Sequence, residues 1–363
     1  MQQKPLHLLI CPLDWGLGHA ARCIPVISKL TEAGHRVSLA GYGRSLIMLQ
    51  KEFPSLKSIE LKGFSPSFSR SGNMVLHLFL LLPRFFKTII FEHYEIKKLI
   101  EQHHIDIIIS DNRYGLWNKK IKSILITHQM MIKTPNWLRF AEYFFYRVSR
   151  LMISRFDECW IPDEKEDPGL SGDLSHKYSL PAKARFIGSL SRFQKSGSSQ
   201  DKSANGRKII AIISGPEPQR NIFEQLVTRQ LSELKLEALI IGGKPESAQA
   251  AITYANLTIL PYLATSELRL AISTSALVIC RSGYSSIMDL EALGAKALFV
   301  PTPGQTEQIY LAKLHQQAGA ALWRAQENMD LKIDIHEALK FPGFKIKPVD
   351  IGLVAAIADL QKK

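Results

Sequence analysis

The chain has 363 residues, of which 46% are hydrophobic and 22% charged, and this composition is ordinary for a folded globular protein. A chain of this length accommodates two domains of about 180 residues each. The net charge of +13 predicts an anionic partner, but the absence of any helix-turn-helix, zinc or RNP-like motif argues against a nucleic acid.

The first predicted strand, Leu6 to Cys11, leads into a glycine-containing loop and then a helix that ends at Gly34. Gly16 and Gly18 allow close approach of a ligand to the backbone, and we expect both to bind substrate. His19, at the junction of loop and helix, is a candidate catalytic base. Two alternatives for His19 are a phosphate contact and a helix cap.

The same loop also fits a dinucleotide-binding fingerprint, through Gly16, Gly18 and Ala21. An NAD site needs an acidic residue after the next strand, yet the predicted strand Arg36 to Ala40 runs into Gly-Tyr-Gly-Arg. Arg44 could hold the extra phosphate of NADP, so this alternative stays open.

Asp111 follows the predicted strand Ile105 to Ser110 and is a second candidate catalytic base. His128, after the predicted strand Ile121 to Thr127, is expected in the same tier. The carboxyl ends of parallel strands share one edge of a sheet, which is where ligands bind.

Two segments, Met74 to Tyr94 and Trp137 to Phe156, combine aromatic residues with Arg and Lys. The first is too short and too basic to span a bilayer. Both segments are predicted to be helices, which either pack into the core or rest on an anionic membrane.

A polar break without periodicity predicts a linker at 191–207 between an N-terminal domain, 1–190, and a C-terminal domain, 208–345. The loop after the opening strand, Lys208 to Ile213, carries Ser214, Gly215 and Arg220 as candidates for phosphate binding. Alternating strands and helices on both sides of the break predict an α/β fold of two doubly wound parallel-sheet domains.

The most informative segment is a predicted strand, Leu277 to Cys280, a Gly/Ser loop, and a helix that begins at about Ser286 and stops at Gly294. Such a loop directs backbone N–H groups and the positive end of the helix dipole at one spot, which suits a diphosphate. The loop side chains expected at that spot are Arg281, Ser282, Gly283, Ser285 and Ser286. Asp289, one turn into the helix, is expected to accept hydrogen bonds from ribose hydroxyls. Gln305, Glu307 and Gln308, in a second loop after the strand Lys296 to Val300, suit sugar hydroxyls.

The pattern from Arg281 through Gly283 and Ser285 to Asp289, followed by Glu307 and Gln308, resembles the donor half of GT-B glycosyltransferases, above all family 28. The resemblance implies two Rossmann-like domains facing across a cleft, with Leu263 where such enzymes read a uracil. It also implies that the last segment, 346–363, forms a helix that crosses back to the first domain. At the position of the family's carboxylate near His128 this chain has Gln129.

The residues and the resemblance together predict a glycosyltransferase that moves an N-acetylhexosamine or related hexose from a UDP-sugar to an acceptor, which could be lipid-linked. The resemblance also implies inversion at the anomeric carbon. No metal or cofactor is expected, because there is no Asp-x-Asp or His-Glu-x-x-His motif. The charge of the leaving diphosphate would be stabilised by Arg281, the loop N–H groups and the helix dipole. The alternatives are a nucleotide-sugar hydrolase or epimerase, and a non-catalytic nucleotide-sugar-binding or membrane-docking protein.

The four cysteines are widely spaced, and no signal peptide precedes the first strand. The expected location is therefore the cytoplasm, with peripheral contact at the cytoplasmic membrane face, and the expected cysteines are buried free thiols.

Overall fold

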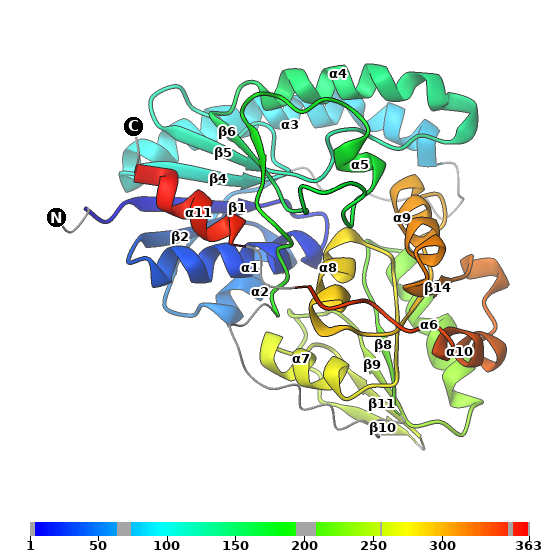
Figure 1. Cartoon of the computed structure of the whole chain (residues 1–363). Coiled ribbons are helices and arrows are strands. Elements are labelled where there is room, and N and C mark those ends of the chain that lie inside the picture. Colours follow the sequence, from blue (N-terminus) through cyan, green and yellow to red (C-terminus); the bar gives the residue numbers. More distant parts are fainter. Residues whose placement is uncertain (1–3, 64–73, 194–207, 255, 348–350, 362–363) are drawn as a thin grey trace.

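The computed structural model describes residues 4–63, 74–193, 208–254, 256–347 and 351–361 (Figure 1). Within these residues the strands form two sheets of seven strands each, one in an N-terminal domain and one in a C-terminal domain. Most of the predicted linker, 194–207, lies outside the described residues.

The N-terminal sheet is parallel throughout. In order across the sheet its strands are β3 (Lys57–Glu60), β2 (Arg36–Gly41), β1 (His7–Pro12), β4 (Ile107–Asp111), β5 (Lys122–Ile126), β6 (Glu158–Ile161) and β7 (Ala184–Phe186). All residues of β1 are buried, because helices cover both faces of the sheet. Leu8 and Ile10 pack toward one face, whereas Leu9 and Cys11 pack toward the other.

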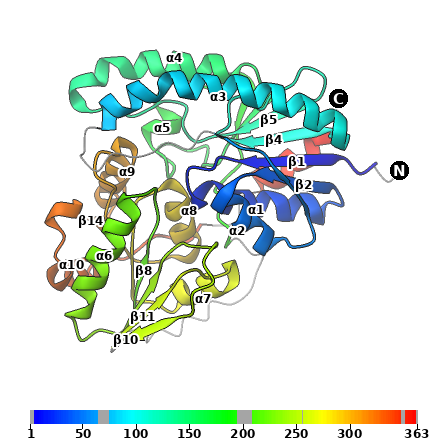
Figure 2. The same ribbon diagram turned by 180° about the vertical axis from the view of Figure 1, so that it is seen from behind.

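The helices of this domain are divided between those two faces. They are α1 (Leu17–Glu32), α2 (Gly43–Glu52), α3 (Met74–His103), the 3-10 helix η1 (Asn136–Ala141), α4 (Glu142–Ile153) and α5 (Asp173–His176). Helices α3 and α4 lie side by side on one side of the sheet, and α1 and α2 lie on the opposite side (Figures 1 and 2). Ile24, Ile27 and Leu30 form the buried stripe of α1, as their helical spacing predicts.

The C-terminal sheet is parallel except for one edge strand, β10, which is antiparallel to its neighbour. In order its strands are β10 (Ile252–Tyr254), β11 (Leu257–Leu260), β9 (Ala238–Ile241), β8 (Ile209–Ile212), β12 (Leu277–Cys280), β13 (Ala297–Phe299) and β14 (Ala321–Trp323). The predicted fold class, two doubly wound parallel-sheet α/β domains, is confirmed.

Helices flank this second sheet in the same way. They are α6 (Gln219–Ser232), α7 (Thr265–Ser273), α8 (Tyr284–Leu293), α9 (Thr306–Gln317), η2 (Gln326–Asn328) and α10 (Leu331–Leu339). Helix α8 ends at Gly294, which has the left-handed φ of +61° that favours glycine after a helix.

After the C-terminal domain the chain returns to the N-terminal domain. Helix α11 (Gly352–Ala358) and the 3-10 turn η3 (Asp359–Gln361) lie beside α1 (Figure 1). Arg185, on the edge strand β7, bonds to Asp359 at 2.9 Å and to the carbonyl oxygen of Ala356 at 3.2 Å. The two domains are therefore connected by two crossings of the chain.

The four cysteines, Cys11, Cys23, Cys159 and Cys280, are buried and free, as predicted. In the part of the chain that the structure describes, no helix has the length and apolarity required to span a bilayer.

Candidate functional site

The carboxyl edges of the two sheets face each other, and the N-termini of α1 and α8 meet there. A Cβ atom on Gly18 would overlap the Oγ atom of Ser285 and lie 3.3 Å from its Cβ atom. Where Gly16 and Gly283 stand, before each helix, a Cβ atom would meet no atom within 4 Å. Two positive helix ends thus lie side by side, with open space in front of each, and this arrangement favours an anionic ligand.

On the N-terminal side, the two predicted catalytic residues contact each other. The Nδ1 atom of His19 lies 2.6 Å from Oδ1 of Asp111. The side chain of Asp111 is fully buried, whereas that of His19 is 20% exposed. Burial alone would raise the pKa of Asp111, but Arg22 and His19 hold this pKa below its usual value. The pKa of His19 is lowered by burial and then by Arg22, so the imidazole is neutral near pH 7.

Arg22 was not among the residues predicted from the sequence. Its guanidinium is buried and bonds to both carboxylate oxygens of Asp111, with Nη2 2.6 Å from Oδ1. The one signal in the sequence is the spacing of three residues from His19, which puts both side chains on the same face of α1.

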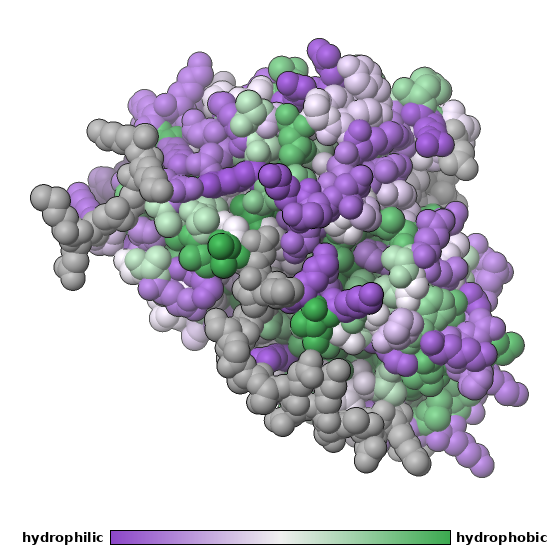
Figure 3. All heavy atoms as spheres, in the orientation of Figure 1, coloured by the Kyte–Doolittle hydropathy of each residue, from purple (hydrophilic) through white to green (hydrophobic). Residues whose placement is uncertain are grey.

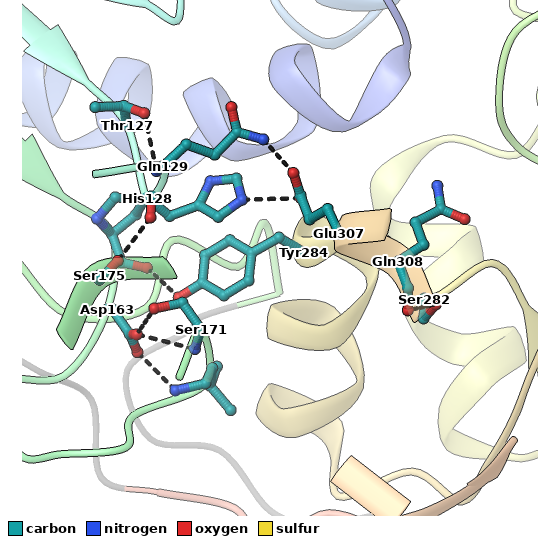
Figure 4. Close-up of polar contacts among 12 residues, drawn as sticks. Thr127, His128, Gln129, Asp163, Ser171, Ser175, Ser282, Tyr284, Glu307 and Gln308 are labelled. Atoms are coloured by element: carbon teal, nitrogen blue, oxygen red, sulfur yellow. Dashed lines mark hydrogen bonds and ion pairs between the residues drawn. The ribbon is translucent and has the colours of Figure 1, made fainter. Parts of the chain in front are cut away.

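His128 and Glu307 join the two domains (Figure 4). Nε2 of His128 lies 3.1 Å from Oε1 of Glu307, and the Gln129 amide bonds to Oε2. The imidazole also stacks on the ring of Tyr284 in α8, with centroids 4.1 Å apart. Tyr284 in turn donates to the carbonyl oxygen of Pro162 at 2.7 Å. The predicted sugar-binding carboxylate of Glu307 is therefore bonded to the N-terminal domain.

Several buried polar atoms without a hydrogen-bond partner lie where the predicted phosphate-binding loop after β8 runs into α6, and in the neighbouring loop. Among the described residues these include Nη1 of Arg220, Oε1 of Gln219 and Oγ1 of Thr302, the last in the loop after β13. Gly215 has a φ of +105° and its Cβ position lies 3.9 Å from that Thr302 oxygen, so the two loops are adjacent. Arg220 pairs with Glu217 through its other donors. Unpaired buried polar groups are rare, and their gathering here favours a polar ligand.

Arg281, predicted to contact a diphosphate, borders the same region. Its buried guanidinium donates to the carbonyl oxygens of Val300 at 2.9 Å and Pro301 at 3.0 Å, and to Gln219 and Gln326. Its Nε atom is a further buried donor without a partner among the described residues. Burial lowers the pKa of Arg281 to about 9. Arg281 thus holds the loop after β13 against the start of α6, and its contact with a diphosphate stays a prediction.

Ser282 and Gln308, both predicted to bind substrate, bond to each other and to the loop after β13, and substrate binding by these two residues stays a prediction. Ser282 is buried and donates to the carbonyl oxygen of Gln308 at 2.8 Å. Oε1 of Gln308 accepts from the Thr302 amide at 2.8 Å.

Asp289 faces the segment that leaves the N-terminal domain. Its carboxylate accepts hydrogen bonds from Ser191 at 2.8 Å and from Arg192 at 2.9 Å. Burial raises the pKa of Asp289 despite the Arg192 charge. Ribose binding by Asp289 remains a prediction, and it requires that these two bonds be exchanged for bonds to hydroxyl groups.

The remaining predicted residues, Ser214, Leu263, Ser286 and Gln305, are half-buried on loops or helix starts of the C-terminal domain. Leu263 packs against the core, and Gln305 stands at the N-cap position of α9 without a capping hydrogen bond from its side chain. Within the described residues no group of three or more His, Cys, Asp or Glu is arranged to hold a metal ion.

Comparisons with known proteins match this arrangement. Residues 209–341 match the glycosyltransferase family 28 C-terminal domain. An uncharacterized glycosyltransferase of Methanosarcina mazei is 25% identical over 342 residues, covering 86% of this chain and 84% of that protein. The UDP-N-acetylglucosamine--N-acetylmuramyl-(pentapeptide) pyrophosphoryl-undecaprenol N-acetylglucosamine transferase of Pasteurella multocida is 34% identical over 122 residues, covering 32% of this chain and 34% of that enzyme.

Among solved structures, the spinosyn rhamnosyltransferase SpnG complexed with thymidine diphosphate superposes with a TM-score of 0.61 and 17% identity. The superposition covers 98% of this chain and 95% of that chain, so the likeness extends over both sheets.

Proposed function

We propose that this glycosyltransferase moves an N-acetylhexosamine or related hexose from a UDP-sugar to an acceptor hydroxyl. The enzyme class follows from the match of residues 209–341 to the family 28 C-terminal domain and from the GT-B fold of the two facing sheets. A nucleotide sugar is the donor typical of GT-B glycosyltransferases. The choice of UDP is supported by the Pasteurella enzyme, whose name specifies a UDP-sugar donor.

The observation that carries the proposal is the His19 and Asp111 pair opposite the start of α8. The acceptor oxygen attacks the anomeric carbon while its proton passes to Nε2 of His19. The bond from that carbon to the diphosphate oxygen breaks, and its electron pair leaves with UDP. Attack opposite the leaving group inverts the anomeric configuration. Asp111 stabilises the imidazolium that forms.

The departing diphosphate gains negative charge as this bond breaks. The N-termini of α1 and α8 supply backbone N–H groups and positive dipole ends, and Arg220 has one buried donor free for an anion. These groups support the proposal that the leaving UDP is stabilised by residues of this chain.

The experiment is a thermal-shift panel against UDP, UDP-sugars, GDP-sugars, CMP-sugars and NADP, followed by turnover assays with the sugar that stabilises most. We expect selective stabilisation by UDP and its sugars, and slow release of UDP when only water is available as acceptor. Stabilisation by NADP alone would refute the proposal. If the protein hydrolyses the UDP-sugar rapidly and added acceptors do not reduce the transfer of the sugar to water, the protein is a nucleotide-sugar hydrolase and not a transferase.

The matched variant for the turnover assay is His19→Ala. It should lower kcat by about 10² to 10⁴-fold, the range for loss of a general base, and leave the UDP-induced thermal shift unchanged. Equal turnover in the parent and the variant would remove His19 from the mechanism.

The N-terminal domain, which we expect to bind the acceptor, has a surface that suits an anionic membrane. On η1 and α4 the exposed aromatic residues are Trp137, Phe140, Tyr143 and Phe144, and Phe140 is 80% exposed. On the neighbouring α3 the exposed apolar and aromatic residues are Phe86, Ile90, Phe91 and Tyr94. Along the upper edge of Figure 3, over α4, apolar and weakly polar side chains alternate with hydrophilic ones.

The charges on this surface, which we call the α3–α4 surface, are mostly positive. Its exposed charged residues include Arg84, Lys87, Lys97, Lys98, Arg139, Arg147, Arg150 and Arg155. Glu142 is buried and pairs with Lys177 at 2.6 Å, so its charge is not presented at the surface. Aromatic rings that enter the headgroup layer beside Arg and Lys favour an anionic bilayer, and with it an acceptor that is lipid-linked.

Flotation with phosphatidylglycerol vesicles tests the α3–α4 surface. The double variant Phe140→Ser/Phe144→Ser should bind these vesicles at least about tenfold more weakly than the parent. The control is Leu270→Ser, which removes an equally exposed apolar side chain from α7 of the other domain. Equal flotation of parent and double variant would refute membrane docking by this surface.

A further inference from the structure

One chain of buried polar contacts runs from the proposed base to the C-terminal domain. His19 contacts Asp111, Asp111 is bonded by Arg22, Arg22 contacts His128, and His128 contacts Glu307. Four of the five residues come from α1, β4 and the loop after β5, and the fifth comes from α9. The proposed function uses His19 and Asp111, and Glu307 is the predicted sugar-binding carboxylate, but Arg22 and His128 are left without a role.

The protonation of His128 follows from its two partners. Nη1 of Arg22 lies 3.0 Å from Nδ1 of His128, and a guanidinium can only donate hydrogen bonds. Nδ1 therefore carries no proton. The proton of the neutral ring lies on Nε2, which donates to the carboxylate of Glu307 at 3.1 Å.

His19 has two contacts at one ring nitrogen. Its Nδ1 atom lies 2.6 Å from Oδ1 of Asp111, which can only accept, and 2.9 Å from Nη2 of Arg22, which can only donate. The same Nη2 atom also bonds to Oδ1 of Asp111 at 2.6 Å, so His19, Arg22 and Asp111 meet at one point. The Arg22 charge opposes a second proton on this imidazole.

We propose that Arg22 is a positioning residue that fixes the tautomer of His128, keeps the base His19 neutral beside Asp111, and so couples His19 to the donor-side carboxylate Glu307. The coupling rests on the proposed function, because it takes His19 as the base. Arg22 touches neither substrate. It acts by holding Asp111 ionised toward His19 and by holding the imidazole of His128 with its Nε2–H toward Glu307.

A purely structural role for Arg22 gives different expectations. A buried Arg–Asp pair that only held α1 against β4 would contribute to stability, and its loss would not change the protonation of either histidine. The protein offers a matched control in Arg113, which is also buried in the N-terminal domain and bonds Glu92 at 2.9 Å.

The first experiment measures the pH dependence of kcat/KM for the acceptor in Arg22→Gln, Arg22→Lys and Arg113→Gln. The acid limb reports the protonation of the base in the free enzyme. Without the Arg22 charge we expect this limb to move up by about one pH unit, a tenfold change in proton affinity. Arg22→Lys keeps the positive charge, so the acid limb should stay at the pH of the parent. Arg113→Gln should lower stability without moving this limb. An unmoved limb in Arg22→Gln would refute the coupling.

The second experiment needs no substrate and so separates this inference from the proposed function. Long-range ¹H–¹⁵N NMR of the whole chain, with resonances assigned through His128→Asn and His19→Ala, reports which ring nitrogen carries the proton. We expect Nε2–H for His128 in the parent, and loss of this single His128 tautomer in Arg22→Gln. An Nδ1–H tautomer of His128 in the parent would overturn the role of Arg22 even if transferase activity is found.

Discussion

A single carboxylate, Asp111, holds the N-terminal half of the site together. It is buried, stays ionised beside Arg22, and orients His19. Asp111→Asn keeps the shape but removes the negative charge that stabilises the imidazolium. We expect kcat to fall by about 10² to 10⁴-fold with unchanged UDP affinity, as measured by steady-state kinetics and UDP titration.

The control is Asp106→Asn, at the opposite end of the same strand. Asp106 accepts from the His7 amide at 2.8 Å and lies away from the facing sheet edges. Its kcat should equal that of the parent. If both variants lose activity equally, the loss reflects a damaged sheet and not a missing charge.

A second prediction at this scale concerns Asp289, whose bonds to Ser191 and Arg192 were not expected. If ribose hydroxyls replace these partners, Asp289→Ala should weaken UDP binding by about 1 to 3 kcal/mol, the usual cost of a lost charged hydrogen-bond acceptor. Isothermal titration with UDP measures this change. If the affinity for UDP is unchanged, Asp289 does not bind the ribose and serves only in the contact with Ser191 and Arg192.

Residues at strand ends could be predicted and buried cations could not. Asp111, His128 and Glu307 were found because they follow apolar strands, and the structure brings them into one network. Arg281 also follows a strand, but its acceptors are carbonyl oxygens at Val300, Pro301 and Gln219, far away in the sequence. No local pattern reports such acceptors, so its burial was missed.

At the scale of elements, the close approach of α1 and α8 depends on the missing side chain of Gly18. In Gly18→Ala the new methyl group overlaps Ser285 Oγ, so the helices separate or Ser285 changes its rotamer. We expect a loss of about 1 to 3 kcal/mol in stability, the usual cost of overpacking, and weaker UDP binding. Thermal unfolding with and without UDP measures both effects.

Gly16→Ala is the matched control, since no atom lies within 4 Å of its Cβ position and its φ of 176° is extended backbone. The double variant Gly18→Ala/Ser285→Gly removes the overlapping hydroxyl and should recover most of the loss. A Gly18→Ala variant as stable as Gly16→Ala would show that α1 and α8 tolerate a larger separation.

Most helices and strands could be predicted from periodicity and glycine stops, because parallel strands buried on both faces are continuously apolar. The strand predicted at Leu277 to Cys280 is observed with those bounds. The start of α8 was predicted about two residues late, at Ser286 rather than Tyr284, because an aromatic residue gives no cap signal. Tyr284 is buried by His128 of the other domain, and this contact has no counterpart in the local sequence.

At the scale of the whole molecule, the carboxylate of Glu291 in α8 lies near two carboxylates of the N-terminal domain. Burial raises the pKa of Glu291 to about 7, and the facing charged groups are Lys347, 3.4 Å away, with Glu164 and Asp163 of the N-terminal domain. Between pH 4.5 and about 7 the folded protein keeps a proton that the unfolded chain has released. Stability should therefore fall as pH rises through this window, by at most about 3 kcal/mol for a shift of about 2.5 units.

The test compares melting temperatures of the parent and Glu291→Gln from about pH 5 to about pH 8. The variant should become the more stable of the two as pH rises, because its amide has no proton to release. Glu32→Gln, which removes an exposed carboxylate paired with Lys29, controls for the loss of a surface charge. A difference between Glu291→Gln and the parent that does not depend on pH would refute the prediction.

The return of α11 to the N-terminal domain also has a consequence for biosynthesis. Leu353, Ala356 and Ile357 belong to the same buried cluster as Ile24 and Ile27 of α1, yet they are translated after the whole C-terminal domain. A domain usually folds as its own residues emerge from the ribosome. Here the N-terminal domain is synthesised first, but one side of α1 stays exposed until α11 has been made. The N-terminal domain therefore completes its core only after the C-terminal domain has been synthesised.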